Sequence, residues 1–341
     1  MIIKYAKTGF ETGQLTIEGR EAGLPLEPGE VLVKISASYV APFVPYVCDP
    51  QTAYVTPERP FAPGMDPVGT VLAVGEAVDR VAIGDAVYGD VFLDGGWDGH
   101  EGAAAFAGNF ALSDTADRLF DRYRHGAFAS HILLPQACLT KIAPALDKAT
   151  VQTLTRLGWL CTAFAALDRG RFQAGEHVVV LGASGQLGSS AVMMALAMGA
   201  SQVTCVGRCL DRLAPLAELG DRVSLALGAP KGADVVISAA EGDCTTMVET
   251  AIANLSRGGR FVLLASPAVP PQAGGLVLRG ITLVGSFWFD RDAPGRVVEM
   301  IASGQLDLSR IQSHSYPLEQ VNQALATAAG LPVFQQNVLV P

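Results

Sequence analysis

The sequence lacks paired cysteines and an excess of positive charge. Six cysteines are scattered over 341 residues without a CxxC pair, which is too sparse for a disulfide framework and wrongly spaced for zinc. Lys and Arg number 24 against 33 Asp and Glu, a net charge of −9 that disfavours contact with nucleic acid or an acidic membrane surface. We therefore expect reduced cysteines, and neither a nucleic acid nor a membrane as a partner.

No secretory signal can be recognised near Met1, because no apolar core is followed there by small residues. The uncharged run from Val178 to Gly207 is long enough to raise the question of a membrane span, but it contains five glycines and is better interpreted as strand, turn, helix and strand. Half of the residues are hydrophobic and 17% are charged, which favours a folded protein with a sizeable core. We expect it in the cytoplasm.

The length favours two domains, and the pattern changes near residue 150. Up to there, short apolar runs such as Val31–Ile35, Gly69–Gly75 and His131–Leu134 are interrupted by Gly and Pro, which predicts an antiparallel, largely all-β unit. After a helical stretch from about Lys148 to Arg169, apolar strands alternate with helices. That alternation is typical of a doubly wound α/β domain with a parallel sheet covered on both faces.

One connection in the second domain is unusually short. Only the segment Gly228–Gly232 separates the third strand candidate from the fourth, whereas a parallel crossover normally needs about a dozen residues. We therefore predict a truncated third strand and no helix in that connection, within a sheet of order 3-2-1-4-5-6.

A glycine-rich turn follows the first strand of this domain. Gly182, Gly185 and Gly188 are three residues apart, after the apolar strand His177–Leu181 and before a helix rich in Ala and Met. Glycines in this context permit a tight turn and close approach of a pyrophosphate, and the helix N-terminus attracts its charge. The turn predicts a dinucleotide site formed by Gly182, Ser184, Gly185, Gln186, Leu187 and Gly188.

The end of the second strand indicates which dinucleotide binds. A site for NAD usually carries a carboxylate there, but Gly207 and Arg208 follow Val206, and Arg212 lies one turn later. Arginine can bind a 2′-phosphate that a carboxylate would repel, so the sequence favours NADP(H). The alternative is a solvated arginine in a site of mixed preference.

Several motifs give the chain a resemblance to the medium-chain dehydrogenase/reductase superfamily. They are the glycine turn, Pro63–Gly69 followed by Val74-Gly75, Val81–Val87, Gly126–Ala129 and the C-terminal Tyr316–Ala324. The resemblance implies a GroES-like β-rich domain at residues 1–149 and 287–341, and a Rossmann NADP(H)-binding domain at residues 150–286. It also implies that the cofactor site is completed by Thr162, Ala239, Ala265 and Phe287.

The chain departs from the zinc alcohol dehydrogenases of that superfamily at the metal. Those enzymes have Gly-His-Glu where this chain has Gly64-Met65-Asp66, and their early cysteine ligand falls at about Ala41. The four-cysteine structural zinc lobe is replaced by the acidic segment from Asp90 to Asp121. Catalytic zinc needs three N, S or O ligands, so we expect no metal and a closer resemblance to the zinc-free quinone oxidoreductases and enoyl reductases.

Relatives without zinc often carry an Asn-x-x-Asp-x-Tyr segment after the first long strand, and only its tyrosine matches here, as Tyr46. The resemblance makes Tyr46 the candidate catalytic phenol, and its neighbours Tyr39 and Tyr54 could serve instead. The alternative is that Tyr46 is only a wall of the pocket. The other residues expected to line an apolar substrate pocket are Tyr39, Ala41, Phe43, Tyr54 and Met65.

The favoured hypothesis is a zinc-independent, NADPH-dependent reductase of a conjugated carbonyl in a hydrophobic small molecule: an enone, enoyl thioester or quinone. The alternatives are an NADP(H)-dependent alcohol dehydrogenase or carbonyl reductase without zinc, and a non-catalytic NADPH-binding protein. The resemblance also implies a homodimer, paired through the edge strand Gly280–Val284, because an exposed apolar edge needs covering.

Overall fold

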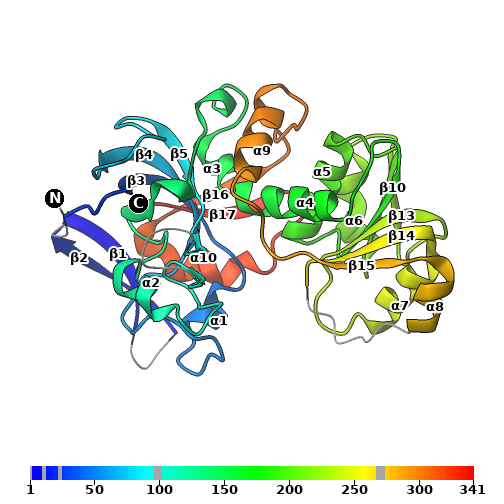
Figure 1. Cartoon of the computed structure of the whole chain (residues 1–341), viewed down its shortest axis with the longest axis horizontal. Coiled ribbons are helices and arrows are strands. Elements are labelled where there is room, and N and C mark those ends of the chain that lie inside the picture. The colour runs from blue at the N-terminus through cyan, green and yellow to red at the C-terminus, as the bar shows by residue number, and fades with distance from the viewer. Residues whose placement is uncertain (1, 10–12, 22–24, 96–101, 266–272) are drawn as a thin grey trace. The chain divides into compact units, whose positions relative to one another are not determined.

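The computed structural model describes residues 2–9, 13–21, 25–95, 102–265 and 273–341. Contacts divide the chain into two compact units (Figure 1). The first comprises Met1–Leu157, Leu308–Leu331 and Gln335–Pro341, and the second comprises Gly158–Asp307 and Pro332–Phe334. Among the described residues, no helix combines the length and the apolar character needed to cross a bilayer.

The first unit is built on a large β-sheet of order β16-β17-β3-β4-β5-β9, with β8 paired to β3. The hairpin β1–β2 and the short pair β6–β7 stand apart from it. The strands are β1 Ile2–Thr8, β2 Leu15–Glu21, β3 Glu30–Tyr39, β4 Met65–Val74, β5 Ala86–Gly89, β6 Phe92–Leu93, β7 Ala105–Phe106, β8 His131–Pro135, β9 Leu139–Lys141, β16 Gln312–Pro317 and β17 Gln335–Val340. Its α-helices are α1 Val44–Cys48, α2 Asp117–Arg122, α3 Val151–Leu154 and α10 Val321–Ala328.

The expectation of an antiparallel unit up to about residue 150 agrees with the main strand pairs there; it did not extend to the last two strands. β3 pairs antiparallel with β4 and β8, and β4 pairs antiparallel with β5. β16 and β17, however, are parallel, with Gln312 opposite Gln335. Helix α10 lies between them in sequence and provides the crossover that a parallel pair needs.

The second unit is the doubly wound α/β domain predicted from the sequence. Its parallel sheet has the order β12-β11-β10-β13-β14-β15. The strands are β10 His177–Leu181, β11 Gln202–Val206, β12 Val223–Ala226, β13 Ala233–Ser238, β14 Leu255–Leu263 and β15 Thr282–Gly285. The helices are α4 Leu157–Arg169, α5 Gln186–Ala197, α6 Leu210–Ala217, α7 Thr245–Asn254, α8 Ala273–Arg279 and α9 Ala293–Ala302. Figure 1 shows α5 and α6 on one side of this sheet and α7 and α8 on the other.

The short connection between the third and fourth strands is as predicted. β12 has four residues, all half-buried, and no helix separates it from β13. The single helix expected from Lys148 to Arg169 is divided into α3 and α4. Thr150 caps α3 by accepting a hydrogen bond from the Thr153 N–H.

The boundaries of the two units differ from the domain boundaries expected from the sequence, near residues 150 and 287. Residues up to Leu157 pack with the first unit, and the return to that unit comes at Leu308. The segment after β15 stays in the second unit because the Arg169 guanidinium, at the end of α4, donates to the carbonyls of Phe287 and Trp288. Arg296 of α9 also lies over the Phe164 ring, 4.4 Å from its centre.

Candidate functional site

The glycine turn joins the carboxyl ends of three neighbouring strands. Gly182 follows β10 with φ +73°, and the N–H groups of Gly182 and Ala183 donate to the Val206 carbonyl at the end of β11. A Cβ on Gly182 would lie 2.8 Å from the Ala239 carbonyl oxygen, and one on Gly188 would lie 2.1 Å from the Gly182 oxygen. These contacts leave no room for a side chain at either position.

The turn leads directly into the N-terminus of α5. Gly185 is its N-cap residue, it is exposed, and no side chain caps the helix there. Ser184, Gln186 and Leu187 are half-buried beside it. The positive end of the helix dipole can therefore interact with an anionic group brought close by the glycines, so these residues fit the pyrophosphate of a dinucleotide.

The end of β11 presents arginines and no carboxylate. The Gly207 N–H donates to the Ala226 carbonyl, and Arg208 follows in the exposed connection to α6. Arg212, in the first turn of α6, is also exposed. Neither side chain forms an ion pair within the described part of the chain, so both guanidinium groups can bind a phosphate monoester.

The ends of β13, β14 and β15 also meet at this edge of the sheet. The Leu264 N–H donates to the Ser238 carbonyl at 3.0 Å, and the Ser286 N–H donates to the Leu263 carbonyl at 2.9 Å. Ala239 follows β13 directly, Ala265 and Phe287 come two residues after the ends of β14 and β15, and Phe287 is 57% exposed. These three candidate cofactor residues therefore lie at the same edge of the parallel sheet as the glycine turn.

Thr162 differs from the other cofactor candidates. It lies in α4 with 5% of its surface exposed, and its hydroxyl donates to the Gly158 carbonyl at 2.8 Å. The hydroxyl is therefore already engaged within its own helix.

The expected substrate residues of the first unit divide into a buried and an exposed group. Tyr39 and Ala41 are 1% exposed and Met65 is 2% exposed, and Tyr39 lies opposite Met65 in the β3–β4 register. Tyr46, in α1, is 69% exposed, so its hydroxyl is accessible to a small molecule. Of the three tyrosines expected near the substrate, Tyr39, Tyr46 and Tyr54, Tyr46 is the most exposed.

The remaining two candidates belong to an aromatic group around Phe110. Tyr54 stacks on Phe110 with 4.7 Å between ring centres, and Phe43 meets the same ring edge-on at 6.3 Å. Tyr54 is 49% exposed, so this group offers aromatic surface to solvent. Aromatic rings with one open side are suited to bind planar apolar molecules.

Asp66, next to Met65 in β4, is buried and uses its carboxylate inside the unit. The Tyr88 hydroxyl donates to Asp66 Oδ1 at 2.6 Å. Burial raises the pKa of Asp66 to about 7; the hydrogen bond from Tyr88 opposes this effect and the nearby Asp90 adds to it. The sequence analysis did not single out this pair, because Tyr88 is 22 residues away and only the β4–β5 pairing brings it close.

These residues do not fit a catalytic zinc ion. Ala41 offers no ligand atom, Met65 offers only a thioether, and the Asp66 carboxyl is buried against Tyr88. Within the described ranges, no group of three or more His, Cys, Asp or Glu side chains is arranged to hold a metal. A three-ligand zinc site needs nitrogen, thiolate or carboxylate donors in a tetrahedral arrangement, and that set is missing here.

Arg169 is a second residue that the sequence analysis missed. Its guanidinium donates to the Ser286 hydroxyl at 3.1 Å, to the carbonyls of Phe287 and Trp288, and to Asp290. It thereby holds the segment that carries Phe287 at the end of β15. An arginine at a helix C-terminus is common, so its sequence position carried no signal of this role.

Comparisons with known proteins agree with this architecture. Residues 27–144 match the family model of the alcohol dehydrogenase GroES-like domain. The chain is similar to an alcohol dehydrogenase of Moraxella sp. (29% identity, 92% of each chain) and to a 2-methylene-furan-3-one reductase of Solanum lycopersicum (25% identity, 75% of this chain and 60% of the relative). A solved structure of a cobalt- and zinc-bound thermostable alcohol dehydrogenase from Pyrobaculum aerophilum has the same fold (TM-score 0.81, 22% identity, 100% of each chain).

Proposed function

We propose that this chain is a member of the medium-chain dehydrogenase/reductase superfamily of nicotinamide-dependent oxidoreductases, and that it is a zinc-independent, NADPH-dependent reductase of conjugated carbonyl compounds; its GroES-like domain and its similarity to an alcohol dehydrogenase support the membership. The observation that carries the proposal is the ligand set at Ala41, Met65 and Asp66. Without a Lewis acid, reduction of an isolated carbonyl or oxidation of an alcohol loses its main electrostatic aid. A conjugated C=C bond needs only hydride delivery and a hydrogen-bond donor at the carbonyl oxygen.

The second unit supplies the cofactor side of the reaction. Bound NADPH supplies the hydride. Gly182 and Gly188 leave the space that the pyrophosphate needs, and the N-terminus of α5 stabilises its charge. Arg208 and Arg212 bind the 2′-phosphate, and this pairing is the reason for preferring NADPH over NADH.

The first unit supplies the substrate side. Tyr46 donates a hydrogen bond to the substrate carbonyl oxygen and provides the proton that accompanies reduction. Phe43 and the stacked Tyr54 provide aromatic surface, which favours a hydrophobic substrate. The similarity to a 2-methylene-furan-3-one reductase supports a conjugated ketone, since the name of that relative describes one.

A second candidate function is the oxidation of an alcohol or reduction of a carbonyl. Its support is the similarity to an alcohol dehydrogenase over 92% of the chain. Without zinc, this reaction requires side chains that polarise the carbonyl group or remove the proton of the alcohol. A third candidate, a non-catalytic NADPH-binding protein, follows from the same loss of polar residues.

The test is turnover in a strong chelator. We expect NADPH oxidation with a panel of aryl enones, enoyl thioesters and quinones to persist after exhaustive treatment with EDTA and 1,10-phenanthroline, with C=C reduction seen by NMR of the product. Tyr46→Phe should lower kcat by about tenfold to a hundredfold, in the range of a lost general acid, whereas Tyr316→Phe, a half-buried tyrosine of β16, should not.

Other outcomes favour the other functions. Turnover abolished by chelation and restored by Zn²⁺ would overturn the proposal. Reduction of C=O instead of C=C would favour the alcohol dehydrogenase, and tight NADPH binding without turnover across the panel would favour the non-catalytic protein.

We also propose a homodimer formed by edge pairing. β15 is the last strand of the parallel sheet, and Leu283 and Val284 within it are only half-buried. An apolar edge of this kind is covered when two copies pair. Sedimentation at micromolar concentration should show a dimer for the wild type and a monomer for Val284→Lys, and a wild-type monomer would contradict the pairing.

A further inference from the structure

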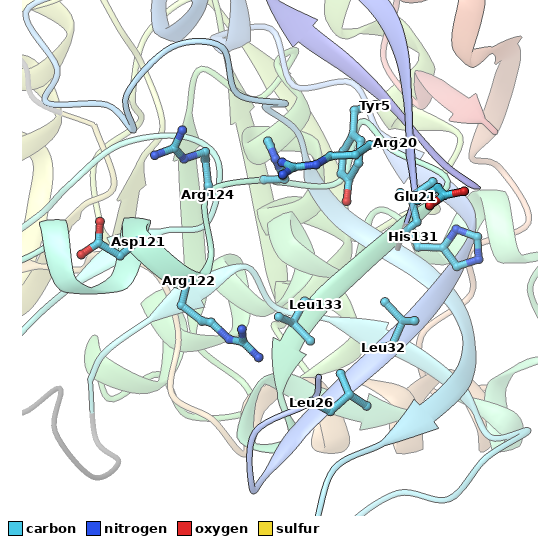
Figure 2. A pocket seen from close by; sticks show the side chains of 12 residues that line it. Tyr5, Arg20, Glu21, Leu26, Leu32, Asp121, Arg122, Arg124, His131 and Leu133 are labelled. Carbon is cyan, nitrogen blue, oxygen red and sulfur yellow. The ribbon is translucent and has the colours of Figure 1, made fainter. Parts of the chain in front are cut away.

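A separate cavity lies entirely within the first unit. It has a volume of about 410 Å³, within the range of roughly 300–1,000 Å³ that is usual for small-molecule sites. The hairpin β1–β2, the strands β3 and β8, and the end of α2 surround it (Figure 2). None of the residues assigned above to substrate or cofactor lines this cavity, so its ligand is independent of the proposed reaction.

One end of the cavity is apolar. Leu32 and Leu133 lie opposite each other in the β3–β8 register and are both half-buried. Leu26, before β3, completes this end, and Figure 2 shows the three leucines gathered together. Their neighbours Val31 and Val33 point into the core and are buried, so the leucines form the outer, accessible face of the two strands.

The other end of the cavity carries hydrogen-bond donors and positive charge. Figure 2 shows Arg20, Arg124 and the Tyr5 hydroxyl at the end away from the leucines. The Tyr5 ring contacts the His125 ring, with 4.5 Å between ring centres and an angle of 42° between the ring planes. Burial raises the pKa of Tyr5, with Arg20 opposing the effect, so the phenol stays protonated and can donate a hydrogen bond.

The arginines that line the cavity differ in how far their charges are already neutralised. Arg122 is committed to Glu30, with Glu27 nearby. Arg124 lies 3.5 Å from Glu58, whose side chain is 84% exposed, a weak pairing. Arg20 forms no ion pair with any residue that the structure describes, so its charge is available to a ligand.

Acidic residues at the rim limit the charge of that ligand. Glu21 and Asp121 also line the cavity and are exposed. They would repel a polyanion, such as a nucleotide or a dicarboxylate, more strongly than a group with a single negative charge. Together with the leucines, this balance favours a molecule with one anionic end and one apolar end.

We propose that this cavity is a binding site for a monocarboxylate with an apolar tail, whose carboxylate pairs with Arg20 and the Tyr5 hydroxyl and whose tail packs on Leu26, Leu32 and Leu133. The carboxylate gains charge-assisted hydrogen bonds. The tail removes the exposed faces of the leucines from water, at about 25 cal/mol per Å² of buried apolar area.

The test uses octanoate as the probe and isothermal titration calorimetry on the full chain. Three further compounds separate the contributions: 1-octanol has the tail without the charge, acetate has the charge without the tail, and octanedioate has a second carboxylate. We expect saturable octanoate binding, and binding at least about tenfold weaker for each of the other three, since tenfold corresponds to about 1.4 kcal/mol.

Variants locate the site. Arg20→Gln should weaken octanoate binding at least about tenfold, because a hydrogen bond to a charged group is worth roughly 1.5–3 kcal/mol. Arg118→Gln is the matched control, since Arg118 is an exposed arginine of α2 that does not line the cavity. Leu26→Ser should weaken octanoate without affecting acetate.

The proposal is overturned if octanoate does not saturate in the millimolar range, or if Arg20→Gln binds it as the wild type does. The second result would place the probe elsewhere, for example among the apolar residues near Tyr46. NADPH binding is measured on the same variants and should be unchanged by Arg20→Gln, which keeps this proposal separate from the proposed function.

Discussion

The two units of this protein differ in what they bury. Among the residues that the structure describes, those that are buried and carry a formal charge are Lys7, Glu30, Asp66, Asp90 and Arg156, and all five lie in the first unit. Among the described residues of the second unit, the buried polar side chains are Ser and Thr only. The interior of its sheet is formed by Val179, Leu181, Val236, Phe261 and their apolar neighbours.

The two units also differ in how polar groups are arranged. In the second unit, the candidate cofactor site consists of backbone N–H groups and glycines at the edge of the sheet, and it places no charged side chain in the interior. The first unit satisfies buried carboxylates with partners such as Tyr88 and Arg122. Because a buried charge that loses its partner is costly, we expect the first unit to be more sensitive to substitution and pH.

The largest expected effect is the loss of the buried ion pair between Arg122 and Glu30. The Glu30 side chain is 3% exposed and that of Arg122 is 16% exposed. Arg122→Met leaves the Glu30 carboxylate buried without its main partner, so the free energy of unfolding should fall by about 3–5 kcal/mol. Urea unfolding followed by circular dichroism measures this.

The control for this change is Arg118→Met, in the exposed part of the same helix. It should change the free energy of unfolding by less than about 0.5 kcal/mol. Equal effects for the two variants would mean that the buried pair does not stabilise the first unit.

The second effect is a dependence of stability on pH that originates at Asp66. Burial raises its pKa from 3.8 to about 7, so the folded state holds this proton more tightly than the unfolded chain. The contribution is fully present below pH 3.8 and is lost as the pH rises through about 7. At about 1.4 kcal/mol for each pKa unit, the loss over this whole range is about 4.5 kcal/mol, of which about 3 kcal/mol falls between pH 5 and pH 7.

Asp66→Asn removes this group and tests the prediction. The stability of the wild type relative to Asp66→Asn should fall between pH 5 and pH 8, as measured by urea unfolding at each pH. Asp147→Asn, at an exposed position, should show no such trend. A difference between wild type and Asp66→Asn that is constant with pH would contradict the raised pKa.

The third effect concerns the second unit. Gly188→Ala places a Cβ 2.1 Å from the Gly182 carbonyl oxygen, and crowding of this kind costs typically 1–3 kcal/mol. The turn must shift, so NADPH affinity should fall at least about tenfold, more than the loss in stability alone explains. The control is Gly295→Ala in α9, where no atom lies within 4 Å of the added Cβ; it should leave stability and NADPH affinity unchanged. Unchanged NADPH affinity in Gly188→Ala would show that the turn does not hold the cofactor.

The features that the sequence could predict are those set by residues close together in the chain. The truncated β12 and the glycine turn follow from local patterns, because connection length and glycine spacing determine them, and the order of the parallel sheet is the one usual for a Rossmann domain. The parallel pairing of β16 with β17 and the contact of Tyr88 with Asp66 depend on residues far apart in the chain. No local pattern encodes such pairs, so they became visible only in the folded structure.

The candidate site shows the same division. The sequence predicts cofactor residues near Gly182 and Arg208 because backbone geometry constrains the residue type at such positions. On the substrate side, Ala41 and Met65 stand where the resemblance places zinc ligands, and no pattern in the sequence indicates which residues would replace the chemistry of the metal. Tyr46 is accessible, and its role remains a prediction for the turnover experiment.

The most direct test of the account is a titration of the metal-free protein with NADPH and with NADH, followed by nicotinamide fluorescence, on wild type and Arg208→Ala. We predict that NADPH binds at least about tenfold more tightly than NADH, and that Arg208→Ala removes most of this difference, because a charge-assisted hydrogen bond to the 2′-phosphate is worth roughly 1.5–3 kcal/mol. Equal affinity for the two cofactors, no binding by the metal-free protein, or an unchanged preference in Arg208→Ala would contradict it.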